Sequence, residues 1–259
     1  EYMSISLKGK RMLYKHELMM LEMLANANWE RPMYMAITVG SENHLNLGDN
    51  FMQEGLAYRI TPFNTTKLNA RIDSEKMYDN LMHKFKFGGI DKDDIYLDET
   101  VMRMAQTHRR MFVQVASQLI KEGKNEKALK ALDYCQQVIP SKNVAHDYVM
   151  SSSKEMADAY IALGEYAKAE AILDELGNKA VEYITWYMSL DDERLALSYD
   201  NCIRNFYILD EINKSLERIT SLKTGQPEGE MTVSSEMEEH YAKKFNELYD
   251  MFNIRVGRK

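Results

Sequence analysis

The sequence predicts a mainly α-helical protein, with a small, partial α/β segment at the N-terminus followed by an array of α-helical hairpins. Only four prolines and twelve glycines interrupt the 259 residues, which favours long helices over many short strands. From about residue 99 onward, apolar residues recur at helical spacing. Residues 116–132 and 157–173 also repeat one pattern. We therefore expect an α/β domain over residues 1–90 and a helical domain over residues 91–259.

The composition excludes several classes of protein. Hydrophobic residues make up 45% and charged residues 28% of the chain, as in globular proteins and unlike disordered ones. The formal net charge of −7 disfavours a protein that binds the nucleic-acid phosphate backbone. The longest apolar runs are far shorter than the ~20 residues of a membrane span, and the start shows no signal-peptide pattern.

The N-terminal third mixes helical and strand patterns. Apolar spacing predicts an amphipathic helix over residues 14–27. Pro32 cannot lie inside a helix, and the β-branched and aromatic residues after it predict a buried strand over residues 33–40. Further elements are expected as a strand at 56–63, a helical turn at 51–55 and a short edge strand at 2–7.

Residues 64–98 connect the two parts. A helix is expected over residues 74–85, capped by Asp73 or Ser74. The aspartates that follow suggest two interpretations, a calcium loop or a solvated acidic turn. An EF-hand loop needs a glycine at position six and a closing glutamate. Counted from Asp91, those positions hold Tyr96 and Met102, so we favour the solvated turn.

Helices are expected over most of the remaining chain. The predicted ranges are 99–122, 125–138, 147–163, one helix starting at Tyr166, 180–190, 193–222 and 234–252. Asp191, Asp192 and Glu193 place negative charge at a helix N-terminus, where the dipole favours it. Ser235 and Glu238 have the spacing of a capping box. A loop around Gly225, Pro227 and Gly229 and a frayed basic tail at 255–259 complete the chain.

The repeated stretches resemble tetratricopeptide hairpins. Aligned on Gly123 and Gly164, each has alanines where the two helices would cross, at Ala116 and Ala128 and at Ala157 and Ala169. Small residues at such points let helix backbones approach, and the glycines suit a helix end. The glycines are 41 residues apart rather than ~34, and only two hairpins are clear where about three are needed. We expect the helices of 180–222 and 234–252 to supply the missing neighbours.

Stacked hairpins of this kind leave a concave face that commonly holds a peptide or a partner helix. The repeat register places eight residues on that face: Arg110, Val113, Ser117 and Lys121 from the first hairpin, and Ser151, Lys154, Asp158 and Ile161 from the second. The predicted ligand is a protein or peptide partner. The carboxylate-clamping lysines and asparagines of tetratricopeptide domains are not reproduced. A groove filled by the chain's own neighbouring helix is the alternative.

No catalytic signature stands out. Glycine-rich phosphate loops, metalloprotease and nucleophile-elbow motifs are missing from the sequence. The six histidines are scattered singly, and Cys135 and Cys202 fit neither a metal nor a disulfide spacing. Cys135 is expected to be a buried thiol, and most of the nineteen methionines to be packing residues. We predict no catalytic residue, cofactor or metal site in this chain.

Two N-terminal motifs carry a second resemblance. The segments Asn28-Trp29-Glu30-Arg31-Pro32-Met33-Tyr34 and Gly55-Leu56-Ala57-Tyr58-Arg59 resemble a bacterial family of large multi-span membrane proteins, whose membrane part is similar to protein O-mannosyltransferases. Members end in a soluble region with these motifs and tetratricopeptide-like helices. The resemblance implies that this chain is such a region, on the extracytoplasmic (periplasmic) face of the inner membrane. The catalytic residues and lipid-sugar site would lie in the membrane part.

The seven residues that match the motifs are Trp29, Arg31, Pro32, Tyr34, Gly55, Tyr58 and Arg59. We expect them to be structural, because glycine and proline set backbone geometry and aromatic residues pack. Arg31 and Arg59 are the exceptions most suited to a functional role. The leading hypothesis is a non-catalytic accessory domain that organises acceptor proteins or partner subunits. Its rivals are a free-standing cytoplasmic tetratricopeptide adaptor and an enzyme with a site between the α/β segment and the helices.

Overall fold

A computed structural model describes residues 3–226 and 234–257 of the chain. Its backbone divides into two compact units, residues 1–86 and residues 87–259. Within the described residues there are nine α-helices and one three-stranded sheet, and the sheet lies in the first unit. The prediction of a mainly α-helical protein with a small α/β N-terminal segment is confirmed.

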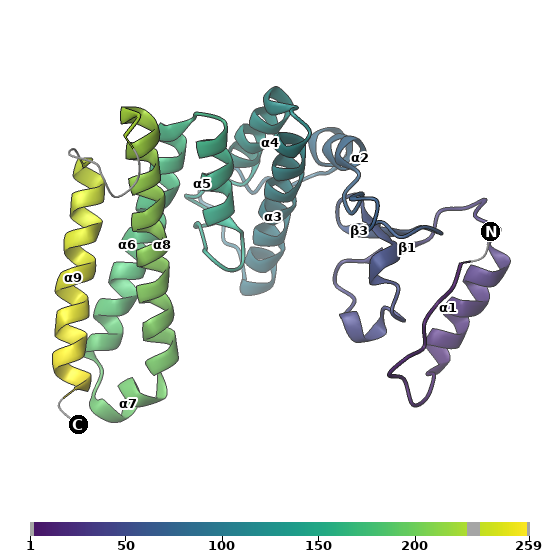
Figure 1. Ribbon diagram of the computed structural model, residues 1–259, viewed down its shortest axis with the longest axis horizontal. Helices are drawn as coiled ribbons and strands as arrows, with labels where there is room; N and C mark the ends of the chain where they lie inside the picture. Colours follow the sequence, from purple (N-terminus) through teal and green to yellow (C-terminus); the bar gives the residue numbers. More distant parts are fainter. Residues whose placement is uncertain (1–2, 227–233, 258–259) are drawn as a thin grey trace. The chain divides into compact units, whose positions relative to one another are not determined.

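The first unit is built on a small antiparallel sheet with the order β1-β3-β2 (Figure 1). Its elements are α1 (Lys15–Asn26), β1 (Tyr34–Ala36), 3-10 turns at Ser41–Asn43 and Gly48–Asn50, β2 (Phe51–Gln53), β3 (Ala57–Ile60), and α2 (Ser74–Asp79), which continues as a π-helical turn over Asn80–Lys84. Asp73 caps α2 by accepting a hydrogen bond from the backbone N–H of Lys76, one of the two caps expected.

Three expectations for this unit are wrong. The strand after Pro32 has only three residues instead of eight, and Tyr34 and Ala36 are exposed, because β1 is an edge strand and the chain turns back after Ala36. Residues 51–55 form β2 and a tight turn rather than a helical turn, since pairing with β3 overrides local preference. The described part of the expected edge strand, residues 3–7, is irregular; Tyr2 lies outside the described residues.

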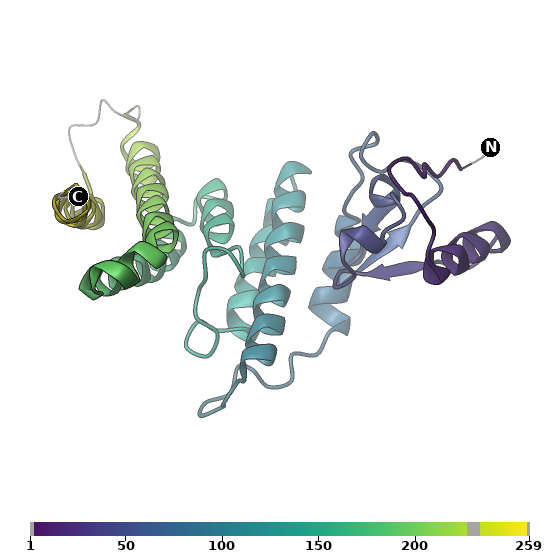
Figure 2. The ribbon, with the colours of Figure 1, turned by 90° about the horizontal axis from the view of Figure 1, so that it is seen from below.

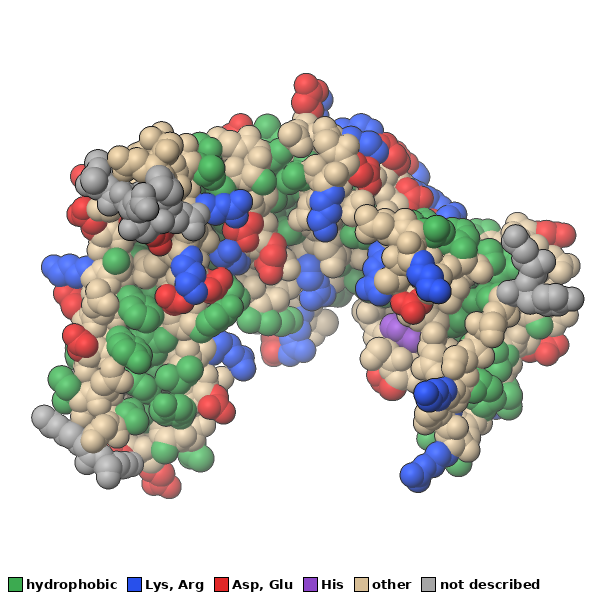
Figure 3. All heavy atoms as spheres, viewed as in Figure 1, with side chains coloured by type: hydrophobic (Ala, Val, Ile, Leu, Met, Phe, Trp, Pro, Cys, Tyr) green, Lys and Arg blue, Asp and Glu red, His purple; other side chains and the backbone are tan. Residues whose placement is uncertain are grey.

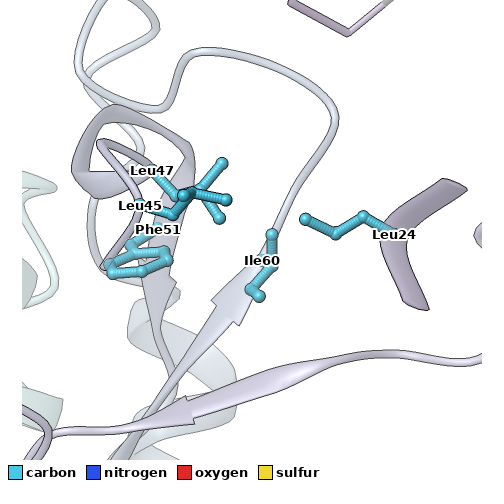
Figure 4. Close-up of a cluster of buried hydrophobic side chains, with 5 residues drawn as sticks. All are labelled: Leu24, Leu45, Leu47, Phe51 and Ile60. Carbon is cyan, nitrogen blue, oxygen red and sulfur yellow. The ribbon is translucent and has the colours of Figure 1, made fainter. Parts of the chain in front are cut away.

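The core of the first unit draws on a loop as well as on regular elements. Leu45 and Leu47, from the polar segment between β1 and β2, are almost fully buried against Phe51 and Ile60. Leu24 of α1 approaches the same cluster from the side of Ile60 (Figure 4). Burying a leucine contributes about 1.5–3 kcal/mol, so both leucines favour the packing of this loop against the sheet.

The second unit consists of helices packed side by side. They are α3 (Glu99–Lys121), α4 (Asn125–Val138), α5 (Ser153–Ala162), α6 (Tyr166–Ser189), the short α7 (Asp192–Leu197), α8 (Tyr199–Thr224) and α9 (Glu236–Val256). Contacts pair α3 with α4, α5 with α6, α6 with α8, and α8 with α9, while α3 also packs on α5 (Figures 1 and 2). The first two pairs are the expected hairpins, and Gly123 and Gly164 end their first helices with left-handed φ values of 73° and 78°.

Several boundaries in this unit differ from the prediction. The helix expected from residue 147 begins at Ser153, because residues 140–152 form a loop held by hydrogen bonds. The helix that starts at Tyr166 runs unbroken to Ser189. Gly177 lies inside it, since a Cβ there would be 2.5 Å from the Tyr241 ring of α9. The helix expected over 193–222 is two helices, α7 and α8.

The predicted caps of α7 and α9 are present, and the C-terminal tail differs from the prediction. Asp191 caps α7 and Ser235 with Glu238 forms the predicted capping box. The tail expected to fray from residue 255 is helical to Val256, and Arg255 donates hydrogen bonds to the carbonyls of Met188 and Leu190. Pro227 and Gly229, with residues 258–259, lie outside the described residues. No helix that the structure describes is both long and apolar enough to cross a membrane.

Two aspartates of the acidic turn before α3 have partners within the protein. Asp93 forms an ion pair with Lys142, and Asp98 caps α3 by accepting a hydrogen bond of 2.8 Å from the Val101 N–H. Throughout the described part of the chain, no group of three or more His, Cys, Asp or Glu side chains is placed to hold a metal ion.

Candidate functional site

A buried carboxylate, Glu54, lies at the centre of a polar cluster in the first unit. Its side chain is only 3% exposed. The Tyr34 hydroxyl donates a hydrogen bond of 2.8 Å to Oε2, and Lys76 Nζ lies 2.6 Å from the same oxygen. Arg59 Nε lies 3.1 Å from Oε1, an ion-pair distance without the angle of a hydrogen bond. One carboxylate therefore meets two cations and a phenol.

The strand register brings these groups together. Tyr34 and Arg59 are directly paired across β1 and β3. Glu54 lies at the turn between β2 and β3, where Gly55 adopts a φ of 130° that disfavours any L side chain. A Cβ at Gly55 would also meet the Phe85 ring at 3.2 Å. The glycine thus lets the chain reverse while Glu54 points inward.

The third residue in contact with Glu54 is Lys76 of α2. Hydrogen bonds connect this helix, and the residues just before it, to the turn that carries Glu54. The backbone of Gln53 hydrogen-bonds to Arg71 and Asp73, at 2.8 and 3.0 Å. The side-chain amide of Asn80 donates 2.6 Å to the Glu54 carbonyl. These bonds place Lys76 over Glu54 and over the Tyr34 ring, 5.8 Å from its centroid.

The electrostatics of the cluster are those of a buried carboxylate paired with two cations. A buried carboxylate is costly unless it is paired and hydrogen-bonded. The hydrogen bond to Glu54 raises the pKa of Lys76 above its usual value, against the effect of burial. Lys76 is therefore held in its charged form beside Glu54. The charged groups of the cluster face one another, with Lys76 and Arg59 both within ion-pair distance of Glu54.

The remaining motif residues divide into two groups. Tyr58, next to Arg59 on β3, stacks on Phe51 with centroids 5.3 Å apart and packs into the core. Trp29, Arg31 and Pro32 lie exposed in the turn before β1, where Trp29 has a left-handed φ of 59°. Within the described residues, Arg31 forms no hydrogen bond or ion pair. The structure gathers Tyr34, Gly55 and Arg59 and leaves Arg31 apart from them.

Sequence reasoning missed the residue that organises the cluster. Glu54 directly precedes the Gly55–Arg59 motif, so an acid beside a turn glycine was a visible signal. Nothing in the sequence marked Lys76 as a partner of Glu54, because a lysine on a short amphipathic helix usually lies on the solvated face.

Seven of the eight residues predicted for a partner-binding face lie on α3 and α5, which pack on each other, and Ser151 lies in the loop before α5. Arg110, Ser117 and Lys121 follow one another along α3. Lys154 and Asp158 on α5 form an ion pair, with hydrogen bonds of 2.8 and 2.9 Å. The other three residues expected on this face, Val113, Ser151 and Ile161, are buried in the helical core and are not available to a partner.

A cavity lies along α6, a helix for which the sequence gave no indication of a site. It has a volume of about 820 Å³ and is lined by Ala145, Ala171, Asp174, Glu175, Asn178, Lys179, Glu182, Tyr183 and Trp186. A second cavity of about 320 Å³ shares Lys179 and Tyr183 with it and extends to residues 147–150 and α8. Trp186 is 53% and Tyr183 45% exposed. Hydrophobic side chains also gather on the face over α8 (Figure 3). We call the two cavities together the α6 groove.

A buried arginine holds the loop that borders the α6 groove. Arg109 of α3 is fully buried and donates to the carbonyls of Ile139, Val144 and Ala145, at 2.9, 2.5 and 3.1 Å. Burial raises the pKa of the neighbouring Cys135 thiol to about 12 and lowers that of His146 to about 3. Cys135 is thus the buried thiol that was expected, and the extra residues between the hairpins are an ordered loop.

A comparison with known protein families gives a match within the first unit. Residues 1–77 match the family model described as TMEM260-associated domain 2. The match covers α1, the sheet and the Glu54 cluster, including Lys76. Among curated proteins and solved structures, nothing matches the chain. The family match is compatible with the resemblance to protein O-mannosyltransferase-like membrane proteins.

Proposed function

We propose that this chain is a non-catalytic accessory region of a membrane glycosyltransferase-like protein related to protein O-mannosyltransferases. The observation that carries the proposal is the match of residues 1–77 to a TMEM260-associated domain, which contains both sequence motifs. Under this proposal the chain lies on the extracytoplasmic side, and the catalytic groups lie in the membrane-embedded part of the same protein.

The geometry of the Glu54 cluster supports a structural role for the motifs. Tyr34 and Arg59 bind a buried carboxylate of their own unit, and Gly55 provides the turn that places this carboxylate. A catalytic acid or base must reach a substrate proton, and Glu54 is 3% exposed and enclosed by Tyr34, Arg59 and Lys76. In this proposal the motifs therefore hold the fold of the first unit and do not form a reaction centre.

The helical unit supplies the partner-binding function in this proposal. We propose that its hairpins are tetratricopeptide-like and that α6 receives a segment of an acceptor protein or partner subunit. The α6 groove offers two exposed aromatic residues, Tyr183 and Trp186, of the kind that dominate binding hot spots. Glu182, one turn from Trp186, is exposed and forms no ion pair within the described residues. A basic side chain of the partner would complement it.

The test compares the isolated 259-residue chain with membranes that contain the whole protein. We expect transfer from a lipid-linked sugar to an acceptor protein only in the membranes, and Trp186→Ala to lower that transfer. Tyr96→Ala is the matched control, because Tyr96 is 89% exposed on the same unit but lies outside the α6 groove. Sugar transfer by the isolated chain would favour the alternative of an enzyme; unchanged transfer in the Trp186 variant would contradict the role of the groove.

A further inference from the structure

Thioether and imidazole side chains converge on one cavity of the first unit, between α1 and β1. The cavity has a volume of about 310 Å³ and is lined by His16, Met19, Met20, Met23, Met33, Tyr34, Met35 and Ile60. Six of these eight residues carry a sulfur or imidazole donor, and no carboxylate is among them. We call these six residues the methionine–histidine cluster.

The periodicity of the two elements explains the convergence. His16, Met19, Met20 and Met23 follow the i, i+3, i+4, i+7 spacing of one helical face. Met33 and Met35 are two residues apart at β1, so their side chains share one face of the strand. The Met33 carbonyl accepts a 2.9 Å hydrogen bond from Ile60 N, which fixes this end of the strand on the sheet.

Apolar packing accounts for only part of the cluster. Met20, Met33 and Met35 pack against the core around Leu24 and Ile60. Met19 and Met23, in contrast, are 57% and 60% exposed, so they fill no gap in the core. The His16 imidazole stacks on Tyr14 at 5.8 Å and forms no hydrogen bond or ion pair with the described part of the chain. Its nitrogens are thus open to a ligand.

We propose that the methionine–histidine cluster binds a soft monovalent metal ion, Cu(I). Soft thioether ligands select Cu(I), and imidazole suits copper as well, whereas Mg²⁺ and Ca²⁺ require oxygen ligands. Thioethers carry no proton to displace, so five of the six donors are always available. The nearby Glu17 carboxylate is buried and paired with Lys10 and lies outside the cavity. This site is independent of the proposed accessory function.

The test is an anaerobic titration of the 259-residue chain with Cu(I) in competition with a chromophoric Cu(I) chelator. To remove thiol binding, Cys135→Ala and Cys202→Ala are introduced in every sample. We expect one equivalent of Cu(I), and a loss of affinity on the order of 100-fold or more when Met19, Met23 and Met35 are replaced by leucine, because direct ligands matter at least as much as outer-shell partners. Leucine keeps the apolar volume and removes the sulfur.

The matched control replaces Met104 and Met251 by leucine, since each is 56% exposed and lies on the second unit. Titration with Ag(I), followed by the NMR signals of the methionine methyl groups, gives a second readout. Shifts confined to the five cluster methionines support the site. The inference is overturned if the parent chain binds no Cu(I), or if the control and cluster variants lose affinity equally.

Discussion

Tyr34 and Arg59 face each other across the β1–β3 pair, and both side chains reach the carboxylate of Glu54. The Tyr34 hydroxyl is 2.8 Å from Oε2 and Arg59 Nε is 3.1 Å from Oε1. Each residue comes from a different sequence motif, so Glu54 is the physical link between the motifs.

Glu54→Gln should destabilise the first unit, because it leaves Arg59 and Lys76 beside a neutral amide. Breaking a buried ion pair from one side costs about 3–5 kcal/mol. Both cations are a third or more exposed, so we expect about 1–3 kcal/mol. Urea unfolding followed by Trp29 fluorescence in a Trp186→Phe background isolates this unit. Glu30→Gln, at an exposed position, is the control; equal stability of the two variants would refute the structural role of Glu54.

Gly55→Ala should be more damaging than the same substitution at Gly48. At Gly55 the φ of 130° and the Phe85 ring at 3.2 Å both oppose a Cβ, whereas nothing lies within 4 Å of a Cβ at Gly48. A residue held in such backbone strain costs about 1–3 kcal/mol. The same Trp29 unfolding assay compares the two variants. A Gly55 variant as stable as the Gly48 variant would show that the turn tolerates side chains.

Gly177→Ala should loosen the packing of α9 on α6, since its Cβ would lie 2.5 Å from the Tyr241 ring. Overpacking of this kind costs about 1–3 kcal/mol. Tyr241→Leu should cost less in the Gly177→Ala background than in the parent chain, because it removes the clash. A double-mutant cycle on Trp186 fluorescence measures this coupling; additive effects would contradict the contact.

His146 should make the second unit less stable in acid. Burial lowers its folded-state pKa to about 3, below the value of about 6.5 in an unfolded chain. The unfolded state therefore binds the extra proton, so stability is complete above pH ~6.5 and falls with decreasing pH by up to about 1.4 kcal/mol per unit until pH ~3. His146→Asn should flatten this decline and His240→Gln, at an exposed position, should not. Identical pH profiles would exclude His146 as the cause.

The sequence predicted the helices better than the strands, for a physical reason. The backbone hydrogen bonds of a helix form within its own segment, so the spacing over 99–122 and 125–138 came within one residue of α3 and α4. A strand depends on its partners, and β2 was mistaken for a helical turn because only its pairing with β3 makes it a strand. Gly177 shows the same limit, since the α9 ring that requires a glycine there is 64 residues further along the chain.

The candidate site was only half visible in the sequence. The motifs pointed to Tyr34, Gly55 and Arg59 because their residue types are distinctive. Glu54 and Lys76 are ordinary charged residues whose role depends on a shared position in space. The α6 groove was missed because the face expected to bind a partner was inferred from the first helices of the hairpins, while α6 is the second helix of its pair.

The most direct test of the central claim is a fractionation of cells with an antibody raised against residues 87–226. If the chain is the accessory region of a membrane glycosyltransferase-like protein, the antibody should detect a band much larger than 30.2 kDa in the membrane fraction. Protease added from outside the inner membrane should remove that band. A band of about that smaller mass in the soluble cytoplasmic fraction, protected from the protease, would contradict the claim and support the free-standing adaptor.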